Sequence, residues 1–299
     1  MLIKQLYMPY WYVQSRILRK KRPLQTVLFV TDYCNLKCRH CTPAGHGCSG
    51  MKSYEQIREE LLYSYKLGSR FVDFEGGEPT LWQDGEYRLN DLYRMAKDIG
   101  FFSCTLTTNG QRPFSGTLAD SVWVSVDGYG AYHDAVRGQG TFAILDKNIR
   151  QSGHPALSIS MAVNRINRPS LADTVRYAKD NPAIRSIAIN LHTPFPGTEE
   201  LTLTWSERIK VLDELLELKR QGYPIMNSYS GLKIMKRRGF PKDCWIANYI
   251  LLDGTKLACC PGSILGVCED CGFCMSGEMY CVLRLKTDTL RAGMDLRLR

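Results

Sequence analysis

No stretch of the sequence approaches the roughly 18 consecutive apolar residues that a membrane-spanning helix needs. Internal repeats and low-complexity segments are also missing, and 25 Gly and 13 Pro in 299 residues are too few for a collagen-like chain. The first 23 residues place their charges after their apolar part and lack a small-residue cleavage site, so they do not form a secretory signal. These absences predict a globular cytoplasmic protein with one large domain, or a large domain and a small companion.

Acidic residues are missing from residues 1–25, which carry six Lys or Arg interleaved with aromatic residues, and the tail 282–299 is also basic. The body between these ends is close to neutral, although the whole chain has a net charge of +9. A basic aromatic N-terminal segment over residues 1–25 is typical of peripheral contact with an anionic membrane or an acidic protein. We expect such a contact and no nucleic-acid partner. The simpler alternative is a solvated end that aids solubility.

Cysteine, in contrast, is abundant, with 12 residues in two groups and at two isolated positions, Cys48 and Cys104. The first group lies between residues 34 and 41, and the second comprises seven cysteines between residues 244 and 281. In a reducing compartment, closely spaced cysteines are more often metal ligands than disulfide partners. The sequence therefore predicts metal binding in both groups.

Apolar, β-branched runs alternate with segments of helical periodicity between residues 26 and 222. We expect strands at 26–31, 70–75, 102–107, 121–126, 157–163 and 184–190, and helices at 53–67, 87–98, 141–151, 170–179 and 204–221. Such alternation predicts an α/β fold in which a parallel sheet curves into a partial (β/α)6 TIM-like barrel. Ligands of such sheets lie at the carboxyl ends of the strands.

After residue 222 this alternation ends. Residues 250–257 predict a β-hairpin that turns at Asp253-Gly254, and a cysteine-rich stretch with little periodicity follows. We therefore expect three parts: the N-terminal segment 1–25, a barrel core over 26–222, and a small cysteine-rich domain that contains the hairpin over 223–299.

Cys34, Cys38 and Cys41 lie on one loop directly after the first expected strand, with the spacing C-x3-C-x2-C. An aromatic residue precedes the first cysteine and His40 precedes the last. Three thiolates do not complete a four-ligand site, but they can hold a [4Fe–4S] cluster with one iron free for a small-molecule ligand. This pattern resembles the signature of the radical S-adenosylmethionine (SAM) superfamily. From the residues alone, zinc is the alternative.

Further motifs of that superfamily follow in order, each near the end of an expected strand. Gly76-Gly77-Glu78-Pro79 resembles its GGEP element, Thr107-Thr108-Asn109-Gly110 its TNG element, and Ser125-Val126-Asp127-Gly128 its S-x-D-G element. Paired glycines let the backbone approach a ligand closely, and the resemblance implies that the GGEP element binds the methionine amine of SAM. It also implies that Ser125 and Asp127 approach the ribose and carboxylate of SAM, with Asn164 as a further candidate. Residues 133–138 are similar to a segment that recurs in this part of the superfamily.

The resemblance also implies the chemistry. A [4Fe–4S] cluster with three cysteine ligands chelates SAM, reductive cleavage of SAM gives a 5′-deoxyadenosyl radical, and this radical abstracts hydrogen from a substrate C–H bond. The electron must come from a carrier, which we expect to be an acidic flavodoxin or ferredoxin.

The second cysteine group begins with Cys244, nine intervening residues, Gly254, four more residues and Cys259, which resembles the opening of a SPASM or twitch domain. The resemblance implies at least one auxiliary [4Fe–4S] cluster, in which Cys244 and Cys259 are joined by two of the later cysteines, Cys268, Cys271, Cys274 and Cys281. The later spacing is compressed relative to the SPASM pattern, so two clusters are an alternative and structural zinc is another. We expect Cys48 and Cys260 to be spectators.

The sequence constrains the substrate less. SPASM-type relatives include enzymes that modify peptides and proteins, so we expect a peptide or protein substrate. The alternatives are an isoprenoid, another lipid or a small metabolite, modified by radical addition or dehydrogenation, because the core and the basic N-terminus also resemble the hopanoid-synthesis-like branch. A different class is a non-catalytic metal-binding interaction protein, which the intact cysteine loop and the GGEP element disfavour.

Overall fold

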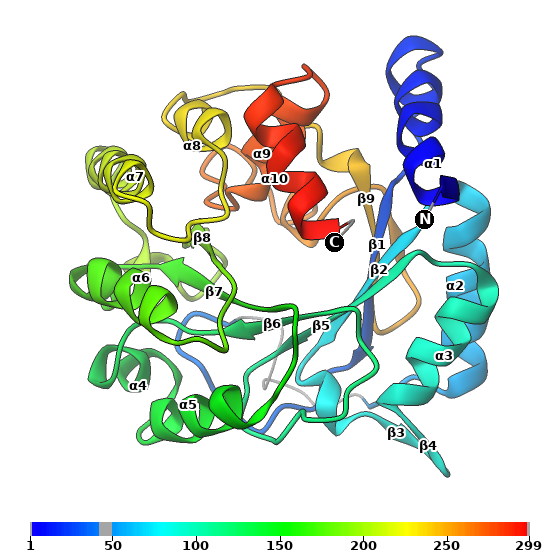
Figure 1. The fold of residues 1–299 in the computed structure, drawn as a ribbon, viewed down its shortest axis with the longest axis horizontal. Helices are drawn as coiled ribbons and strands as arrows, with labels where there is room; N and C mark the ends of the chain where they lie inside the picture. The colour runs from blue at the N-terminus through cyan, green and yellow to red at the C-terminus, as the bar shows by residue number, and fades with distance from the viewer. Residues whose placement is uncertain (1, 42–49, 298–299) are drawn as a thin grey trace.

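A curved parallel sheet forms the centre of the protein (Figure 1). The computed structural model describes residues 2–41 and 50–297, so Cys48 lies outside the described residues. Six parallel strands neighbour one another in chain order: β1 Gln25–Thr31, β2 Phe71–Gly76, β5 Ser103–Thr108, β6 Ser121–Ser125, β7 Leu157–Val163 and β8 Ile187–Leu191. The expected α/β fold with a partial TIM-like barrel is confirmed.

Helices cover the outer face of this sheet: α2 Tyr54–Leu67, α3 Leu89–Ile99, α4 Ala131–Arg137, α5 Thr141–Gln151, α6 Leu171–Asp180 and α7 Trp205–Arg220 (Figure 1). A short hairpin, β3 Gln83–Asp84 and β4 Tyr87–Arg88, precedes α3. A capping box forms at the start of α7, because the Thr204 N–H donates to the Glu207 carboxylate at 2.7 Å and the Glu207 N–H donates to Thr204 Oγ1 at 3.3 Å. Helix α4 was not predicted.

The two faces of the sheet differ in chemistry. Side chains that face the helices, such as Val72, Leu106 and Ile159, are fully buried and belong to the main hydrophobic core. Because successive side chains of a strand point to opposite faces, the alternate positions line the concave inner face. On β5, β6 and β7 these inner positions are mostly hydroxyl residues: Ser103, Thr105, Thr107, Ser121, Trp123, Ser125, Ser158 and Ser160. These three strands therefore have an apolar outer face and a largely polar inner face, whereas the inner positions of β1 include the apolar Val27 and Phe29.

The predicted hairpin forms between β9 Ala247–Ile250 and β10 Lys256–Leu257. It belongs to the same sheet as the barrel, because β9 pairs in parallel with β1 from Gln25 to Leu28. Asn248 on β9 strengthens this junction by accepting hydrogen bonds from Thr26 at 2.8 Å and Ser69 at 2.9 Å. The hairpin thus extends the barrel sheet, and the division of the chain at residue 222 stays a prediction.

Helices α8 Tyr229–Met235, α9 Met275–Val282 and α10 Thr287–Arg297 pack together beside the barrel (Figure 1). At the other end of the chain, α1 Leu2–Tyr12 continues into a π-helical turn at Val13–Ile17, a helix that the sequence analysis did not predict. None of the helices in the described part of the chain is long and apolar enough to cross a membrane.

One strand begins later than expected. The prediction for the sixth strand started at residue 184, but β8 begins at Ile187. The chain first turns after α6, where the Ile184 N–H donates to the carbonyl of Asn181 at 2.9 Å, and Pro182 has no N–H for a ladder. Apolar composition alone did not reveal this turn.

Candidate functional site

A cavity of about 150 Å³ opens at the carboxyl ends of the parallel strands. Its lining joins residues from the loop after β1, the ends of β2, β5 and β6 with the loops that follow β2 and β5, and the end of α4: Cys34, Leu36, Cys38, His40, Cys41, Glu75, Gly76, Gly77, Glu78, Pro79, Thr107, Thr108, Asn109, Ser125 and Arg137. The structure therefore brings together the three cysteines, the GGEP element, Thr108, Asn109 and Ser125, which the sequence analysis grouped. Asp127 and Asn164 are not part of this lining.

The two glycines let the loop after β2 lie against the cysteine loop. A Cβ at Gly76 would overlap the carbonyl oxygen of Thr31, and a Cβ at Gly77 would overlap the carbonyl oxygen of Tyr33. Gly76 also has a φ of +140°, which side chains rarely adopt. The N–H groups of Gly77 and Glu78 donate to Thr31 and Tyr33, each at 2.7 Å. The glycines are thus required by the contact between two loops.

Glu78 is committed to other residues of the protein. Its carboxylate accepts hydrogen bonds from the Thr108 hydroxyl and the Asn109 N–H, each at 2.7 Å, and from the Thr80 hydroxyl at 2.6 Å and the Thr80 N–H at 3.1 Å. The side chain is 1% exposed. In this arrangement Glu78 ties the loop after β2 to the loop after β5, whereas the sequence analysis expected the GGEP element to bind the amine of SAM.

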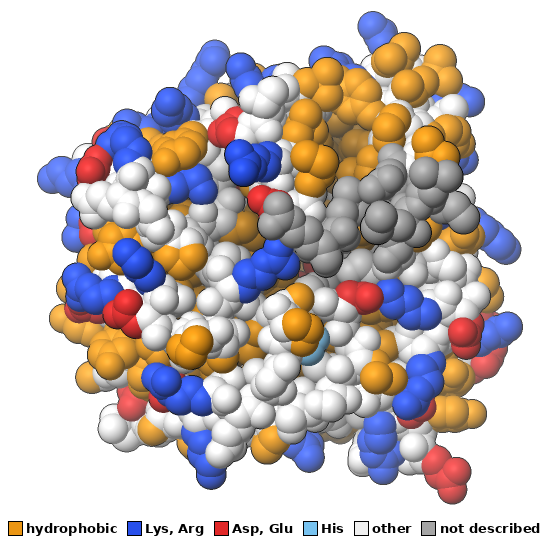
Figure 2. Space-filling model, viewed as in Figure 1, with side chains coloured by type: hydrophobic (Ala, Val, Ile, Leu, Met, Phe, Trp, Pro, Cys, Tyr) orange, Lys and Arg blue, Asp and Glu red, His pale blue; other side chains and the backbone are white. Residues whose placement is uncertain are grey.

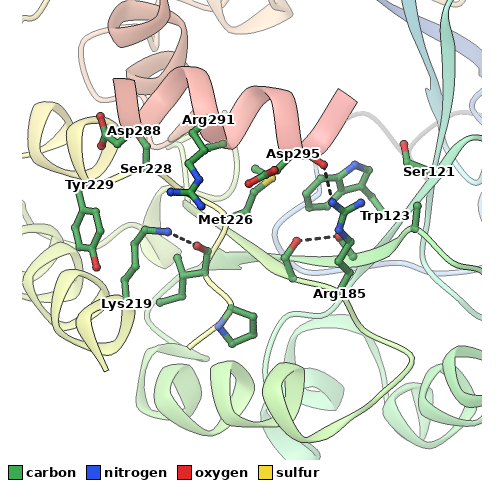
Figure 3. Close-up of a pocket in the computed structure, with 16 residues that line it drawn as sticks. Ser121, Trp123, Arg185, Lys219, Met226, Ser228, Tyr229, Asp288, Arg291 and Asp295 are labelled. Carbon is green, nitrogen blue, oxygen red and sulfur yellow. Dashed lines mark hydrogen bonds between the residues drawn. The ribbon is translucent and has the colours of Figure 1, made fainter. Parts of the chain in front are cut away.

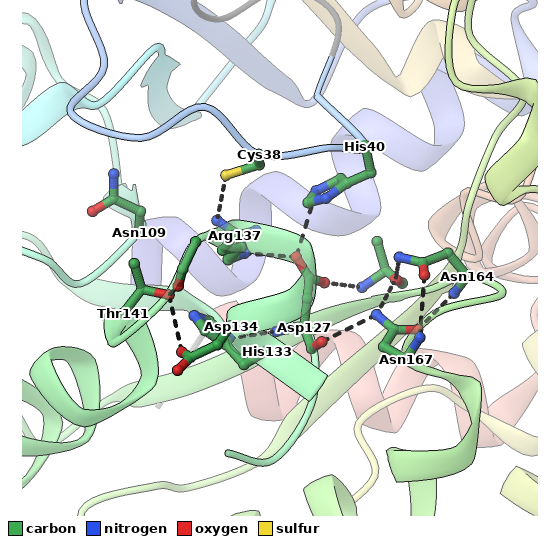
Figure 4. A network of polar contacts seen from close by, with 12 residues as sticks. Cys38, His40, Asn109, Asp127, His133, Asp134, Arg137, Thr141, Asn164 and Asn167 are labelled. Atoms are coloured by element: carbon green, nitrogen blue, oxygen red, sulfur yellow. Dashed lines mark hydrogen bonds and ion pairs between the residues drawn. The ribbon is translucent and has the colours of Figure 1, made fainter. Parts of the chain in front are cut away.

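Asp127 anchors a charged network beneath the cavity (Figure 4). Its Oδ2 accepts from Nε of Arg137 at 2.6 Å and lies 3.4 Å from Nε2 of His40, and its Oδ1 accepts from the Ala162 N–H at 2.8 Å. Burial alone would raise the pKa of Asp127, but Arg137 and His40 outweigh it and lower the pKa to about 2. Asp127 therefore positions Arg137 from below instead of reaching the cavity.

Arg137 extends from this carboxylate toward the first cysteine group. Its Nη1 lies 3.9 Å from Sγ of Cys38 (Figure 4). Burial raises the pKa of Cys38 to about 11, and Arg137 acts in the opposite direction because a cation favours the thiolate. The sequence analysis noted the segment 133–138 but did not name Arg137 as a site residue. The proximity of that segment to the S-x-D-G element was the signal that could have identified it.

Two histidines of the network are neutral for the same reason. Burial lowers the pKa of His40 to about 4 and that of His133 to about 3. Nδ1 of His133 accepts from the Asp127 N–H at 3.1 Å, and Nδ1 of His40 is buried without a hydrogen-bond partner. His40 lines the cavity, so this unpartnered nitrogen leaves room for a ligand contact there.

Asn164 has a local role. Its side-chain oxygen accepts from the N–H groups of Ile166 at 2.9 Å and Asn167 at 3.2 Å, and its amide donates to the Ala162 carbonyl at 3.3 Å (Figure 4). It is fully buried. These bonds shape the turn after β7, which is the common behaviour of asparagine side chains at turns.

The sequence analysis missed a carboxyl group on the cavity floor. Glu75, on the inner face of β2, lines the cavity together with Thr107. Burial, and next the charge of Asp73 two residues earlier on the same face, raise the pKa of Glu75 to about 8. The residue directly before the GGEP element was the available signal.

The second cysteine group divides into two parts. Five thiols lie near one another on three segments, namely Cys244, Cys259, Cys260, Cys268 and Cys271; burial raises the pKa of Cys244 to about 12, and the other four thiolates add to the effect. Burial also raises the pKa of Cys274, and the charge of Cys271 adds to that shift. Cys260, expected to be a spectator, belongs to this set. Cys274 and Cys281, expected among the later ligands, are 0% and 2% exposed, and Cys274 is part of the main core.

The residues of the cavity fit a [4Fe–4S] cluster held by three thiolates. Cys34, Cys38 and Cys41 are half-buried, and Nδ2 of Asn109 lies 3.7 Å from Sγ of Cys34, so both this amide and Arg137 can donate to cluster-bound sulfur. Across the described residues, no three His, Cys, Asp or Glu side chains converge on a single metal ion. A cluster spreads its thiolates over separate irons, so its ligands need not meet at one point.

Known proteins that resemble this chain share parts of it. GTP 3′,8-cyclase of Synechococcus elongatus is 28% identical over 180 residues, which cover 54% of each chain. The same enzyme of Vibrio parahaemolyticus is 27% identical over 173 residues, which cover 52% of this chain and 50% of the relative. GTP 3′,8-cyclase of Aquifex aeolicus is 35% identical over 95 residues, covering 30% and 29%. The chain thus spans about half the length, or less, of these curated relatives.

Solved structures share the fold at low sequence identity. Streptococcus suis SuiB bound to SAM aligns with a TM-score of 0.65 at 14% identity, covering 98% of this chain and 73% of SuiB. The complex of SuiB with its precursor peptide SuiA gives a TM-score of 0.63 at 14% identity, covering 86% and 64%. The enzyme anSMEcpe with bound AdoMet and the Kp18Cys peptide gives 0.56 at 15% identity, covering 92% and 84%.

A family model extends this likeness to the motifs. The model of the radical SAM superfamily matches residues 28–178, which is half of the chain. The matched segment contains the three-cysteine loop, the GGEP, TNG and S-x-D-G elements and Arg137. The chain therefore belongs to the radical SAM superfamily of enzymes.

Proposed function

We propose that this protein is a radical SAM enzyme that modifies a peptide or protein. Membership of the superfamily implies a [4Fe–4S] cluster and SAM, and we assign the cluster to Cys34, Cys38 and Cys41. When bound, these groups supply a 5′-deoxyadenosyl radical that takes a hydrogen atom from a substrate C–H bond. The protein must hold that C–H bond in place and keep water away from it.

The residues around the cavity have different roles in supporting the cluster and in holding the loops. Arg137, held by Asp127, directs a positive charge at the Cys38 sulfur, and Asn109 directs an amide at the Cys34 sulfur. Glu78 fixes the loops after β2 and β5 relative to each other. The backbone at Gly76 and Gly77 therefore stays in contact with the cysteine loop. We infer that SAM binds between these loops, along Thr108, Asn109 and Ser125.

The observation that carries the peptide proposal is the largely polar inner face of β5, β6 and β7. Inner positions of β5 and β6 form a hydroxyl pair, with Thr105 Oγ1 and Ser121 Oγ 3.0 Å apart, and Ser158 pairs with Ser186 at 2.9 Å. An isoprenoid chain offers no hydrogen bonds to an inner face of this kind. A peptide offers amide donors and acceptors along its whole length.

The same inner face leads to a second, larger cavity of about 500 Å³ at the amino ends of the strands (Figure 3). Ser121 and Trp123 of β6 line this cavity, while Ser125 of the same strand lines the cavity at the cysteines. Side chains of both charge signs complete it, including Arg185, Lys219 and Asp288. Such a mixed lining suits the varied side chains of a peptide better than one uniform tail.

Nucleotide substrates are the second possibility, because several relatives are named GTP 3′,8-cyclase. Asp73 argues against a triphosphate along the inner face of β2, because its carboxylate would repel the phosphate charges, whereas Glu75, whose pKa is raised to about 8, is uncharged near neutral pH and adds no repulsion. SuiB has been solved with its precursor peptide SuiA bound, and anSMEcpe with the Kp18Cys peptide bound. Both points favour the peptide.

The test is 5′-deoxyadenosine formation under anaerobic conditions. The reconstituted full chain is incubated with SAM and dithionite beside a Cys34→Ala, Cys38→Ala, Cys41→Ala variant, and deoxyadenosine is followed by mass spectrometry. We expect product from the intact protein only. A peptide mixture from a proteome digest should increase the yield and acquire a mass change. An increase with GTP or a soluble isoprenoid diphosphate, and none with peptides, would contradict the peptide assignment.

We also propose an auxiliary [4Fe–4S] cluster in the cysteine-rich region that begins at residue 223. Its ligands would be Cys244, Cys268, Cys271 and one of the adjacent pair Cys259 and Cys260, since these thiols lie near enough for their charges to raise one another's pKa. After reconstitution we expect about eight irons per chain, whereas about four irons and one zinc would support a structural zinc site.

The electron donor is proposed to be an acidic flavodoxin or ferredoxin in the cytoplasm. Its attraction to the basic ends of the chain predicts that the rate of cluster reduction falls as salt is added. Stopped-flow reduction at increasing sodium chloride checks this, and a rate independent of salt would exclude the electrostatic part of the proposal.

A further inference from the structure

The N-terminal helix carries a stripe of apolar side chains that nothing in the described structure covers. Leu6, Tyr10, Val13 and Ile17 are 63%, 46%, 41% and 63% exposed. Their spacing of four, three and four residues places them on one face of the helix. Figure 2 shows hydrophobic side chains gathered along this helix, at the upper right of the view. Isolated exposed apolar residues are ordinary, but an aligned row on a helix marks an interaction surface.

The opposite face of the same helix is firmly attached to the protein. Trp11 is 2% exposed, stacks on Trp245 with 6.2 Å between ring centroids, and donates through Nε1 to the Arg22 carbonyl at 2.7 Å. The Tyr12 hydroxyl donates to the Leu283 carbonyl at 3.2 Å. These contacts hold the stripe outward, so it cannot turn inward to be buried.

Cationic side chains surround the end of this helix. Arg16, Arg19, Lys20 and Lys21 are all exposed, and residues 1–25 contain no acid to neutralise them. Together with Arg284 and Trp245, three of these residues line a cavity of about 250 Å³ beside the π-helical turn: Arg16, Arg19 and Lys21. The one acid in that lining, Asp243, is 2.9 Å from Arg284 and is thereby paired.

The same cavity contains a buried hydroxyl group without a partner. Ser15 is 4% exposed, lines the cavity, and its Oγ makes no hydrogen bond within the described residues. A buried hydroxyl normally finds a partner, so an unpartnered one beside several cations indicates that an external acceptor completes the site. A phosphate oxygen is an acceptor that also satisfies arginine and lysine.

We propose that this face binds the surface of a membrane that contains anionic phospholipid. The stripe at Leu6, Tyr10, Val13 and Ile17 lies at the boundary between headgroups and acyl chains, and the cavity at Ser15 receives a lipid phosphate. An apolar row flanked by cations and lacking acids is the pattern of helices that lie in a membrane interface. A second copy of this chain is disfavoured as the occupant, because pairing the two stripes would bring two uncompensated basic ends together.

Vesicle flotation of the full chain tests the proposal directly. We expect the protein to float with vesicles of phosphatidylcholine mixed with phosphatidylglycerol, to stay behind with phosphatidylcholine alone, and to be released by added salt. Failure to float with the anionic vesicles would overturn the proposal. Inorganic phosphate should release the protein further than chloride does at equal ionic strength, because it competes with the lipid phosphate for the cavity; equal release by the two salts would remove the cavity from the proposal.

Variants separate the stripe from the charges. Leu6→Ser with Ile17→Ser should weaken binding to the anionic vesicles by at least about tenfold, because the apolar contact is lost. Arg16→Gln with Arg19→Gln should weaken it about thirtyfold, since each cation near an anionic surface contributes about fivefold. The matched control is Ile144→Ser with Leu118→Ser, two comparably exposed apolar residues on other elements, which should leave binding unchanged.

Ser15→Ala tests the cavity itself. The hydroxyl has no protein partner, so its removal should leave the melting temperature unchanged or raise it, while binding to anionic vesicles weakens several-fold. Unchanged vesicle binding in this variant would remove the cavity from the proposal. A dimer in sedimentation analysis that dissociates in the Leu6→Ser, Ile17→Ser variant would identify the stripe as a self-association surface and overturn membrane binding.

Discussion

The two cysteine groups of this protein are built in opposite ways. The first group lies on a single loop after β1, and neighbouring strand ends surround it with the GGEP and TNG elements. The second group is assembled from three separate segments: the turn before β9, the end of the hairpin, and the loop before α9. A site on one loop is encoded in local spacing, whereas a site assembled from several segments depends on how the chain packs.

The cations beside the two groups also differ. Arg137 is fixed by a carboxylate, because Asp127 holds it at 2.6 Å from below the first group. Lys242 lies among the thiols of the second group, and its ammonium rests over the ring of Phe240, 3.3 Å from the centroid. Burial lowers the pKa of Lys242, and the nearby thiolates of Cys271 and Cys244 oppose this shift. The cation beside the first group, Arg137, is thus fixed by a carboxylate, whereas the charge of Lys242 beside the second group depends on the neighbouring thiolates.

The largest expected effect comes from a single cysteine of the first group. Cys38→Ala should abolish deoxyadenosine formation, because two thiolates cannot hold the cluster and the sulfur next to Arg137 is lost. Cys104→Ala is the matched control, since Cys104 is fully buried in β5 away from the cavity. Iron content and deoxyadenosine yield are the measurements. If Cys38→Ala kept its activity, the assignment of the first group would be wrong.

The second prediction tests the division within the C-terminal cysteines. Cys271→Ala should lose about four irons and keep the core cluster, whereas Cys281→Ala should keep its full iron content. The reason is position: Cys271 faces Cys244 and Cys268, while Cys281 is 2% exposed on α9. Iron and sulfide analysis after reconstitution checks both. Equal iron loss in the two variants would mean that spacing, and not the observed packing, identifies the ligands.

The contrast between the groups also explains what could be predicted from the sequence. Strands and amphipathic helices follow from local apolar patterns, so five of the six barrel strands lie within a residue or two of the expected ranges. The residues of the first site lie at strand ends, where parallel strands deliver them to one edge of the sheet. Their proximity, though not their partners, was therefore predictable.

Partners depend on three-dimensional packing and were not predictable. The expected approach of Asp127 and Asn164 to SAM stays a prediction, but the sequence did not show that Asp127 binds Arg137 or that Asn164 shapes its own turn. The ligand assignments of Cys260 and Cys274 stay predictions; the sequence did not show that the turn after the hairpin brings Cys260 near the other thiols while Cys274 is buried in the main core. The spacing of the cysteines in the sequence does not reveal these turns.

The third prediction concerns Arg137, the cation that Asp127 fixes beside the first cysteine group. Arg137→Gln should weaken retention of the core cluster by about tenfold to a hundredfold, the usual effect of removing a group that supports a metal ligand. The control is Arg150→Gln, which removes only an exposed pair with Asp146. Iron remaining after a timed chelator challenge is the readout, together with the affinity for SAM. Because Arg137 is a positioning residue, Arg137→Lys should recover part of the retention. No difference between the Arg137 and Arg150 variants would refute the role.

The smallest expected effect is a difference in acid sensitivity, because the second cysteine region contains no histidine and the network under the first contains two. Burial lowers the pKa of His133 to about 3, so the unfolded chain takes up a proton near pH 6.5 that the folded protein refuses. Stability from this group is therefore complete above about pH 6.5 and is lost as the pH falls toward 3, by about 1.4 kcal/mol per pH unit. His40 acts in the same direction, with its pKa lowered to about 4.

Replacing His133 measures how much of the pH dependence of the unfolding free energy comes from this histidine. In His133→Gln the side-chain oxygen can still accept from the Asp127 N–H, but the slope of unfolding free energy against pH should fall by one proton between about pH 6 and about pH 4.5. Urea unfolding of the cluster-free protein measures it. Phe142→Leu, which alters the ring packed 5.7 Å from His133, should lower stability by a similar amount at each pH. An unchanged slope in His133→Gln would mean that the histidine is protonated inside the fold, which its bond to the Asp127 N–H forbids.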